Sequence, residues 1–228
     1  MGAVFDKYDK SFGAVVQSSI DFSGLPHGFF TAAKADALRE LIATRLHGRH
    51  DLGMLDVGCG VGELHPHLRG MFGRICGADV SEASIAQARA RNPEVRYDAY
   101  AGETLPYDDA AFDLSMAICV LHHVPPPQWL GFVREMRRVV RPGGLVCLIE
   151  HNPFNPLTRL AVARCEFDDD AVLLHAGRTR ALMAHAGLHD TRSQYFLLLP
   201  SAAPLARRVE RSFCRMPLGA QYIASGIA

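Results

Sequence analysis

Three glycines at alternate positions, Gly58, Gly60 and Gly62, follow a short apolar run and could hold a ligand. Glycine lacks a Cβ atom and takes positive φ freely, so such a turn brings a ligand against bare backbone amides. A dinucleotide turn has its third glycine one position later, as Gly-x-Gly-x-x-Gly. The carboxylate of Asp56, just before the first glycine, repels a pyrophosphate and attracts an ammonium or sulfonium group. The pattern therefore favours a cationic, amino-acid-bearing nucleoside over a nicotinamide dinucleotide.

A second carboxylate, that of Asp79, lies near the end of the next expected strand, 23 positions after Asp56. In open α/β sheets ligands bind at the carboxyl ends of the strands, and an acid at about this spacing binds ribose hydroxyls. The alternative role is to cap the helix that follows, but Ser81 can already serve as that cap. We therefore expect Asp79 to bind the hydroxyls of a ribose.

Composition restricts the partners of this chain of 228 residues. Its 24 basic and 24 acidic residues balance, so no nucleic-acid or membrane partner is expected. The longest apolar runs, such as 116–121 and 145–149, have the length of strands rather than of membrane-spanning helices. No signal peptide is recognisable, and neither Cys-x-x-Cys pairs nor zinc-type Cys/His spacings occur. We expect a cytoplasmic protein with reduced thiols and no metal, and leave its oligomeric state open.

Apolar strands alternate with helices between residues 50 and 151, a pattern typical of a parallel sheet covered on both faces. This segment is the expected cofactor-binding core. Its expected strands are 53–57, 75–80, 95–101, 112–120 and 145–150, and its expected helices are 62–71, 81–91 and 128–140. Residues 1–49 precede it as an aromatic arm or lid, followed by a helix from Thr31 to about Gly48.

The regular alternation stops after residue 151. Prolines and an acidic run frame an insertion over residues 152–175, which we expect to lie over the substrate site. Residues 176–228 complete the sheet, with expected helices at 179–186 and 202–214 and expected strands at 195–199 and 221–227. The chain 1–228 is thus expected to be a single α/β domain, doubly wound, with a mostly parallel seven-stranded sheet and an antiparallel C-terminal edge strand.

Six short motifs, taken in order, resemble those of the class I S-adenosylmethionine-dependent methyltransferases, close to the small-molecule group. They are Leu-Asp-Val-Gly-Cys-Gly-Val-Gly (55–62), Gly-Ala-Asp-Val-Ser (77–81), Gly-Glu-Thr-Leu-Pro-Tyr (102–107), Phe-Asp-Leu (112–114), Val-Leu-His-His-Val (120–124) and Arg-Pro-Gly-Gly (141–144). The resemblance covers about residues 50 to 150. It implies a Rossmann-like fold, S-adenosyl-L-methionine as cofactor, and methyl transfer to a small organic acceptor.

The resemblance also implies which residues bind the cofactor. Asp56 would help to hold the methionine amino group, and Cys119 would pack against the methionine end. Gly102 and Glu103 lie in the loop that contacts adenine, although the Asp-Ala pair that precedes the Glu in many relatives is missing here. The full expected set is Asp56, Gly58, Cys59, Gly60, Gly62, Asp79, Val80, Gly102, Glu103 and Cys119.

Three histidines follow strands at the edge where the resemblance places the acceptor. His122 and His123 come after the strand 112–120, and His151 comes directly after Glu150. Histidine is the most frequent general base, so each is a candidate to take a proton from the acceptor. The alternative is that the His-His pair only shapes its loop and that Glu150 is a structural acid.

Two other function classes remain open at this point. An NAD(P)-dependent reductase is disfavoured by the glycine spacing and by the lack of a Tyr-x-x-x-Lys pair. A methyltransferase-like binding or regulatory protein without turnover is compatible with the same motifs. The acceptor nucleophile is left open as oxygen, nitrogen or carbon. Residues 124–127, Val-Pro-Pro-Pro, do not match the Asn/Asp-Pro-Pro-Tyr/Phe motif of enzymes that methylate nucleic-acid amines.

Overall fold

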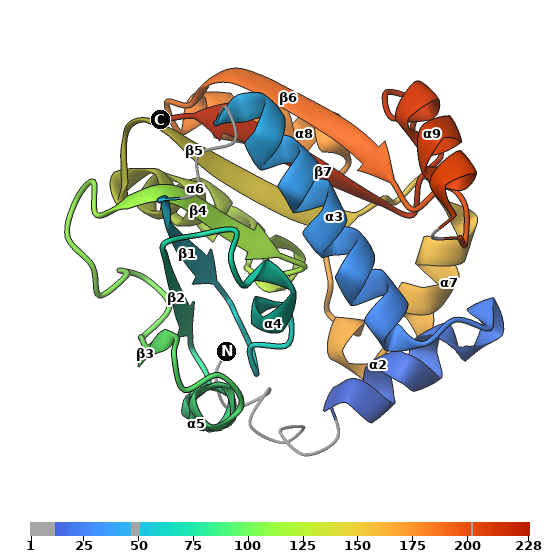
Figure 1. Ribbon diagram of the computed structural model, residues 1–228, viewed down its shortest axis with the longest axis horizontal. Coiled ribbons are helices and arrows are strands. Elements are labelled where there is room, and N and C mark those ends of the chain that lie inside the picture. The colour runs from blue at the N-terminus through green and yellow to red at the C-terminus, as the bar shows by residue number, and fades with distance from the viewer. Residues whose placement is uncertain (1–11, 47–50, 202) are drawn as a thin grey trace.

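The computed structural model describes residues 12–46, 51–201 and 203–228. Seven strands form one sheet with helices on both faces (Figure 1). The strands are β1 (Gly53–Val57), β2 (Arg74–Asp79), β3 (Arg96–Ala99), β4 (Phe112–Ile118), β5 (Val140–His151), β6 (His189–Phe196) and β7 (Gln221–Ile227). The helices are α2 (Phe12–Ile20), α3 (His27–Arg45), α4 (His65–Leu68), α5 (Glu82–Arg91), α6 (Trp129–Arg138), α7 (Pro156–Arg164), α8 (Ala176–His185) and α9 (Pro204–Phe213).

The strand order is β3-β2-β1-β4-β5-β7-β6. Strands β1 to β5 pair in parallel, and β7 runs antiparallel to both of its neighbours, β5 and β6. The predicted doubly wound α/β fold with a mostly parallel seven-stranded sheet is therefore confirmed. The antiparallel strand lies between β5 and β6, so the outermost strand on that side is β6.

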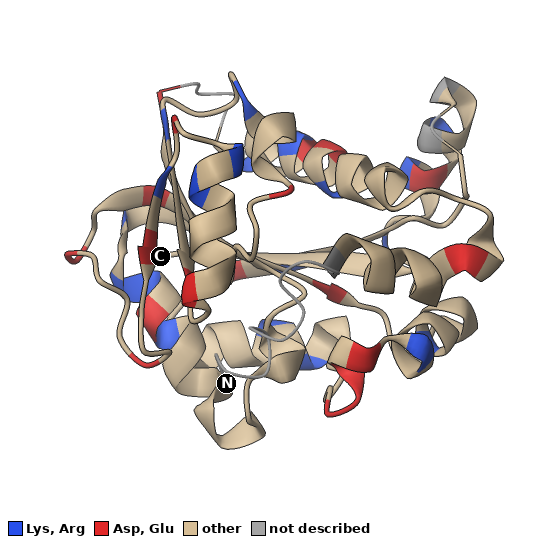
Figure 2. Cartoon of the chain, turned by 90° about the horizontal axis from the view of Figure 1, so that it is seen from below, with Lys and Arg blue, Asp and Glu red and all other residues tan. Residues whose placement is uncertain are grey.

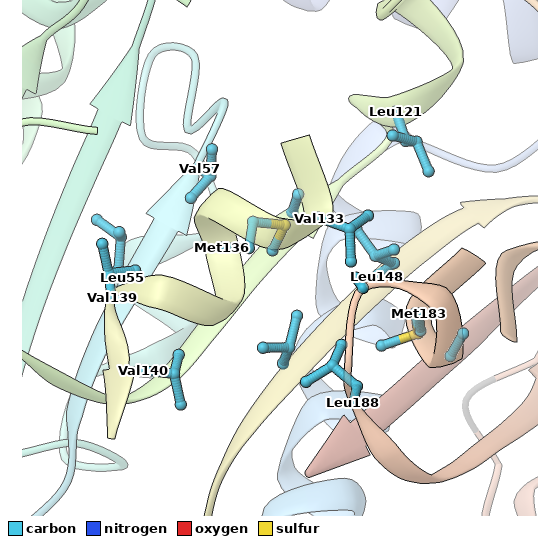
Figure 3. Packing of buried hydrophobic residues seen from close by; sticks show 14 of the residues in the cluster. Leu55, Val57, Leu121, Val133, Met136, Val139, Val140, Leu148, Met183 and Leu188 are labelled. Carbon is cyan, nitrogen blue, oxygen red and sulfur yellow. The ribbon is translucent and has the colours of Figure 1, made fainter. Parts of the chain in front are cut away.

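Two apolar layers cover the opposite faces of the sheet because successive side chains of a strand alternate between faces. On one face, Leu55 and Val57 of β1 belong to the cluster that contains Val133 and Met136 of α6 (Figure 3). On the other face, a second cluster joins α3 and α4 to the sheet. Burying one such aliphatic side chain stabilises the fold by about 1.5–3 kcal/mol. These layers hold the strand ends, and therefore the site, in a fixed arrangement.

Local sequence signals account for several helix ends. Ser81 caps α5 as expected, since its hydroxyl oxygen accepts a hydrogen bond from Ser84 N at 3.1 Å. Asn155 caps α7 in the same way, and its Oδ1 accepts from Thr158 N at 3.0 Å. Such caps satisfy backbone amides that the first turn of a helix leaves unpaired. The cap of α7 thus fixes where the insertion 152–175 turns back over the sheet.

Several expected elements differ from the structure. Strand β5 begins at Val140, five residues before the expected strand 145–150. The helix expected over 62–71 is only the four-residue α4, because the chain takes positive φ at Gly62 and Gly70. The first helix begins at His27 rather than Thr31, and α2 precedes it within the expected arm. The strand expected over 195–199 is β6, which runs from His189 to Phe196. Residues 1–11 and 47–50 of the expected arm and first helix lie outside the described residues.

Charged residues of both signs are interspersed over the elements in Figure 2, in line with a formal net charge of zero. Within the described residues, no helix has both the length and the apolar character needed to cross a membrane.

Candidate functional site

A cavity of about 700 Å³ lies at the carboxyl ends of the central strands. The glycine turn after β1 and the ends of β2, β4 and β5 form its floor. Helices α2 and α3 on one side, and α7 with the turn Glu166–Asp168 on the other, supply the rest of its wall. Helices α2 and α7 contact each other, and they lie side by side in Figure 1. The N-terminal helices and the insertion therefore meet over the strand ends.

The glycine turn has positive φ at all three glycines, with 75° at Gly58, 51° at Gly60 and 69° at Gly62. A Cβ atom on Gly58 would lie 2.4 Å from Val120 Cγ2, and one on Gly62 would lie 2.5 Å from Tyr97 Oη. At Gly60, in contrast, a Cβ would meet no atom within 4 Å. Two glycines are thus required by packing, and the middle one leaves open space on the cavity wall.

A buried chain of hydrogen bonds supports this turn from below. Asn92 Nδ2 donates to Gly62 O at 3.0 Å and to Tyr97 Oη at 2.9 Å. Tyr97 Oη lies 2.5 Å from His65 Nδ1, and His65 Nε2 lies 3.0 Å from Asp56 Oδ2. In the His65 tautomer with its proton on Nε2, Nδ1 accepts from Tyr97 Oη and Nε2 donates to Asp56. The sequence does not predict a role for His65, Tyr97 or Asn92, because these residues come from three separate segments.

Two carboxylates reach the cavity from the ends of β1 and β2. Asp56 Oδ1 is buried on the cavity wall and has no hydrogen-bond partner among the described residues. Asp79 Oδ2 accepts from Gly60 N at 2.8 Å, and its Oδ1 accepts from Ser81 N at 2.9 Å. Burial outweighs these bonds and raises the pKa of Asp79 above its ordinary value. Both expected acids thus frame the glycine turn, and Asp56 offers a free acceptor.

The other expected cofactor-binding residues also line the cavity, except one. Val80, Gly102 and Glu103 lie along its edge beyond β2 and β3. Cys59 lies on its floor, and burial, reinforced by Asp56, raises the pKa of that thiol well above its ordinary value. Gly62 does not line the cavity but packs behind the turn.

Elsewhere on the cavity wall a second buried histidine meets a carboxylate. His122 Nδ1 donates to Glu150 Oε2 at 2.5 Å, and each side chain is 1% exposed. Glu150 Oε1 accepts from Leu121 N at 2.8 Å and from Val120 N at 3.2 Å. Although burial opposes it, the charge of Glu150 raises the pKa of His122, and His122 in turn lowers the pKa of Glu150. Glu150 therefore fixes both the imidazole and the backbone of the His-His turn.

The insertion brings a further carboxylate to this cluster. Asp168 Oδ1 lies 3.3 Å from His122 Nε2 and 3.4 Å from His123 Nε2. Burial and the neighbouring His122 lower the pKa of His123 to about 4. Donor atoms of these three side chains lie within 4.8 Å of one another, a separation that could hold a metal ion. The sequence indicated Asp168 only as part of the acidic run that frames the insertion.

His151 and Cys119 lie near each other on the cavity wall. Gln221 Nε2, at the start of β7, is 3.4 Å from Cys119 Sγ and 3.4 Å from His151 Nδ1. Burial opposes thiol ionisation, but Lys34 and His151 outweigh it and lower the pKa of Cys119 to about 7. Cys119 also takes a φ of 56°, which is strained for a residue other than glycine. Gln221 was missed because the sequence does not show that β7 pairs with β5.

Comparisons with known proteins agree with this fold and with a methyltransferase domain. A family described as a methyltransferase domain matches residues 55–148. The methyltransferase GfsG of Streptomyces halstedii is 29% identical over 203 residues, which cover 82% of this chain and 72% of that protein. A structure from Thermotoga maritima, described as a SAM-dependent methyltransferase and possible histamine N-methyltransferase, superposes with a TM-score of 0.68 at 18% identity. That superposition covers 100% of this chain and 99% of the other.

Residues 55–148 match a methyltransferase domain, and the fold is that of the S-adenosylmethionine-dependent methyltransferases. S-Adenosylmethionine is the cofactor of that domain, and a similar structure, the trans-methyltransferase CalH, contains SAH (TM-score 0.61, 17% identity, 86% of this chain, 58% of the other). The malonyl-[acyl-carrier protein] O-methyltransferase of Salmonella typhimurium is 34% identical over 124 residues. That match covers 53% of this chain and 45% of the relative, and the chain spans less than half the length of the first curated relatives it matches.

Proposed function

We propose that this methyltransferase domain transfers a methyl group from S-adenosylmethionine to a small organic acceptor inside the cavity. The observation that carries the proposal is that one cavity joins the carboxylate-flanked glycine turn to the histidine cluster. Its volume of about 700 Å³ lies within the range of about 300–1,000 Å³ typical of small-molecule sites. The space at Gly60 and the unpartnered oxygen of Asp56 fit a nucleoside that bears an ammonium group.

In this proposal the glycine-turn end binds the cofactor. Asp56 Oδ1 would accept from the methionine ammonium group, directly or through water, and Asp79 would accept from the ribose hydroxyls. Gly102 and Glu103, with Val80, would border the adenine. The cofactor supplies a methyl group on a positively charged sulfur, so the chain has to bind, orient and exclude water rather than generate a reactive group.

The N-terminal helices and the insertion would enclose the acceptor. Ile20 of α2, Val162 of α7 and Phe167 present apolar side chains to the cavity. Positive charge on sulfur disperses as the methyl group leaves, so an apolar and fairly dry enclosure favours the transition state. We accordingly assign the cover of the acceptor to the described part of residues 1–49 and to the insertion 152–175, and the binding of the cofactor to residues 50–151.

Of the three candidate bases, we assign proton removal to His151. Both ring nitrogens of His122 face carboxylates, and His123 Nε2 faces Asp168. His151 has no carboxylate within ion-pair distance among the described residues, and it contacts the neutral amide of Gln221. A base is required only for an acceptor that still carries its proton, such as a hydroxyl. His122 and His123 then shape the acceptor end of the cavity.

A small organic acceptor is supported by the names of the relatives. They include norajmaline N-methyltransferase of Rauvolfia serpentina and 27-O-demethylrifamycin SV methyltransferase of Amycolatopsis mediterranei, which methylate nitrogen and oxygen respectively. The balanced charge argues against a nucleic-acid acceptor. We place the protein in the cytoplasm, in line with its reduced-type cysteine usage.

The test combines a binding and a turnover measurement. Calorimetry with S-adenosylmethionine should show binding to the purified chain. A panel of phenols, alcohols, amines and carbon acids is then screened for formation of S-adenosylhomocysteine. Binding without turnover across the panel would favour the binding or regulatory protein. No binding of S-adenosylmethionine, together with binding of a nicotinamide dinucleotide, would overturn the proposal.

A further inference from the structure

The cluster at the acceptor end of the cavity contains a buried nitrogen that faces a carboxylate without a hydrogen bond. His122 is 1% exposed, and its Nε2 atom has no hydrogen-bond partner among the described residues. Asp168 Oδ1 lies 3.3 Å away, but the contact does not have hydrogen-bond geometry. A buried polar atom without a partner is rare in a folded protein and needs a physical explanation.

The same atom points to a place where two other donors converge. Asp168 Oδ1 lies 3.3 Å from His122 Nε2 and 3.4 Å from His123 Nε2. Donor atoms bound to one ion at about 2.1 Å, at tetrahedral or octahedral angles, are separated by about 3.0–3.5 Å. Both measured separations fall in that range. The cluster therefore has the spacing of a coordination sphere before any side chain moves.

Glu150 completes this arrangement from behind. Its Oε2 atom accepts from His122 Nδ1 at 2.5 Å, so Nε2 is the atom that coordinates an ion once it has given up its proton. A carboxylate behind a ligating histidine fixes the ring and raises its basicity, and it is a regular feature of metal sites. One divalent ion would also balance the two carboxylates, Glu150 and Asp168, that face the two imidazoles.

We propose that His122, His123 and Asp168 bind a divalent transition-metal ion at the acceptor end of the cavity. Two imidazoles and one carboxylate favour Zn²⁺, Fe²⁺, Co²⁺ or Ni²⁺ over Mg²⁺, which prefers oxygen ligands. No metal-binding sequence motif marks this site, because its ligands are far apart in the sequence. The two histidines are adjacent residues after β4, and Asp168 comes from the insertion. Three protein ligands leave coordination positions open toward the cavity.

The use of this ion rests on the proposed methyl transfer. An acceptor hydroxyl bound to the ion would lose its proton more readily, because the ion stabilises the oxygen anion. The proton would leave to His151 or to solvent. The acceptor O–C bond then forms while the C–S bond breaks, and the electron pair of that bond stays on sulfur. The acceptor class is therefore a small molecule with a hydroxyl that can bind the ion.

Cobalt(II) is the probe for the test, because its visible spectrum reports nitrogen and oxygen ligands. The untagged full chain is treated with chelator, dialysed and titrated with Co²⁺ in the absence of S-adenosylmethionine. We expect one Co²⁺ per chain by elemental analysis. His123→Ala and Asp168→Asn should each weaken the binding at least about tenfold. The matched control, Asp169→Asn, removes the exposed neighbouring carboxylate of the same acidic run and should leave the affinity unchanged.

His123 and Asp168 are used because His122 is deeply buried with Glu150, and its replacement risks unfolding. Thermal melts of each variant check the fold. Absence of stoichiometric Co²⁺, or equal affinity in His123→Ala, Asp168→Asn and the parent, would overturn the site as adventitious binding. Calorimetry with S-adenosylmethionine on the same samples keeps the two proposals separate. If the cofactor binds and Co²⁺ does not, only the metal site fails.

Discussion

Two buried histidine–carboxylate pairs each contribute a residue to the wall of one cavity, and their hydrogen bonds are completed in different ways. At the glycine turn, His65 lies between Asp56 and the hydroxyl of Tyr97, and both of its ring nitrogens are hydrogen-bonded. At the acceptor end, His122 lies between Glu150 and Asp168, and its outer nitrogen has no hydrogen bond among the described residues. The imidazole of the first pair is therefore fully hydrogen-bonded, and the imidazole of the second pair is not.

The difference teaches how one sheet edge serves two tasks. A continuous series of buried hydrogen bonds makes a rigid support, which suits a turn proposed to bind the same cofactor in each catalytic cycle. A buried cluster of charged groups that lacks a hydrogen bond lowers the stability of the empty protein, and a bound ion or ligand can restore it. The cysteines follow the same division, since the thiol pKa is raised at Cys59 and lowered at Cys119.

The largest effect is expected from filling the space at Gly60. Gly60→Leu places a side chain into the cavity, and binding of S-adenosylmethionine in calorimetry should fall at least about 100-fold. Gly70→Leu is the matched control, since Gly70 also has positive φ and open space around its Cβ position but lies outside the cavity. Each variant should lose about 1–2 kcal/mol of stability from backbone strain. Equal cofactor affinity in the two variants would contradict the binding role of the turn.

The next effect is a difference in the rate at which the thiols of Cys59 and Cys119 react. Iodoacetamide at pH 7 should label Cys119 about 50-fold faster than Cys59, because only the thiolate reacts and a pKa of about 7 leaves Cys119 half ionised. Its labelling should rise with pH up to about 8 and then level off. Peptide mass spectrometry measures both sites, and the buried Cys147 serves as an unreactive reference. Comparable labelling rates at Cys59 and Cys119 would contradict the difference in thiol pKa between them.

The cofactor end of this comparison was largely predictable from the sequence. Asp56, the glycines and Asp79 are near one another in the chain or end adjacent parallel strands, so the fold class alone brings them together. Their support was not predictable. His65, Asn92 and Tyr97 meet Gly62 only through the packing of α4, the end of α5 and β3, and no local pattern encodes those contacts.

The acceptor end was predictable only in its histidines. Asp168 belongs to an irregular insertion whose sequence has no hydrophobic periodicity, so its position in the fold cannot be predicted. Gln221 reaches His151 because β7 pairs with β5 in a register that sets these two residues opposite each other. The edge strand β6 was placed too late in the chain because its residues His189 to Gln194 are polar and mostly exposed, so they lack the apolar run of a buried strand.

A moderate effect is expected at the second acid of the cofactor end. Asp79→Ala should weaken S-adenosylmethionine binding by about 1–3 kcal/mol, because it removes a carboxylate from the ribose position. Gly60 N and Ser81 N also lose their acceptor, so the melting temperature should fall. Glu82→Ala, an exposed acid in the first turn of α5, is the control and should bind normally. A lower melting temperature with unchanged affinity would make Asp79 a purely structural residue.

The smallest effect tests whether the buried hydrogen bonds beneath the glycine turn hold that turn in place. Tyr97→Phe removes one hydroxyl and leaves His65 Nδ1 and one donor of Asn92 without a buried partner. The free energy of unfolding in urea should fall by about 1–2 kcal/mol, and cofactor affinity should fall about threefold as the turn loosens. Tyr195→Phe is the control, because this half-buried hydroxyl has no hydrogen bond among the described residues, and it should change neither value. If Tyr97→Phe behaves like its control, these hydrogen bonds do not hold the glycine turn in place. The difference between the two histidine–carboxylate pairs would then rest on Asp168 alone.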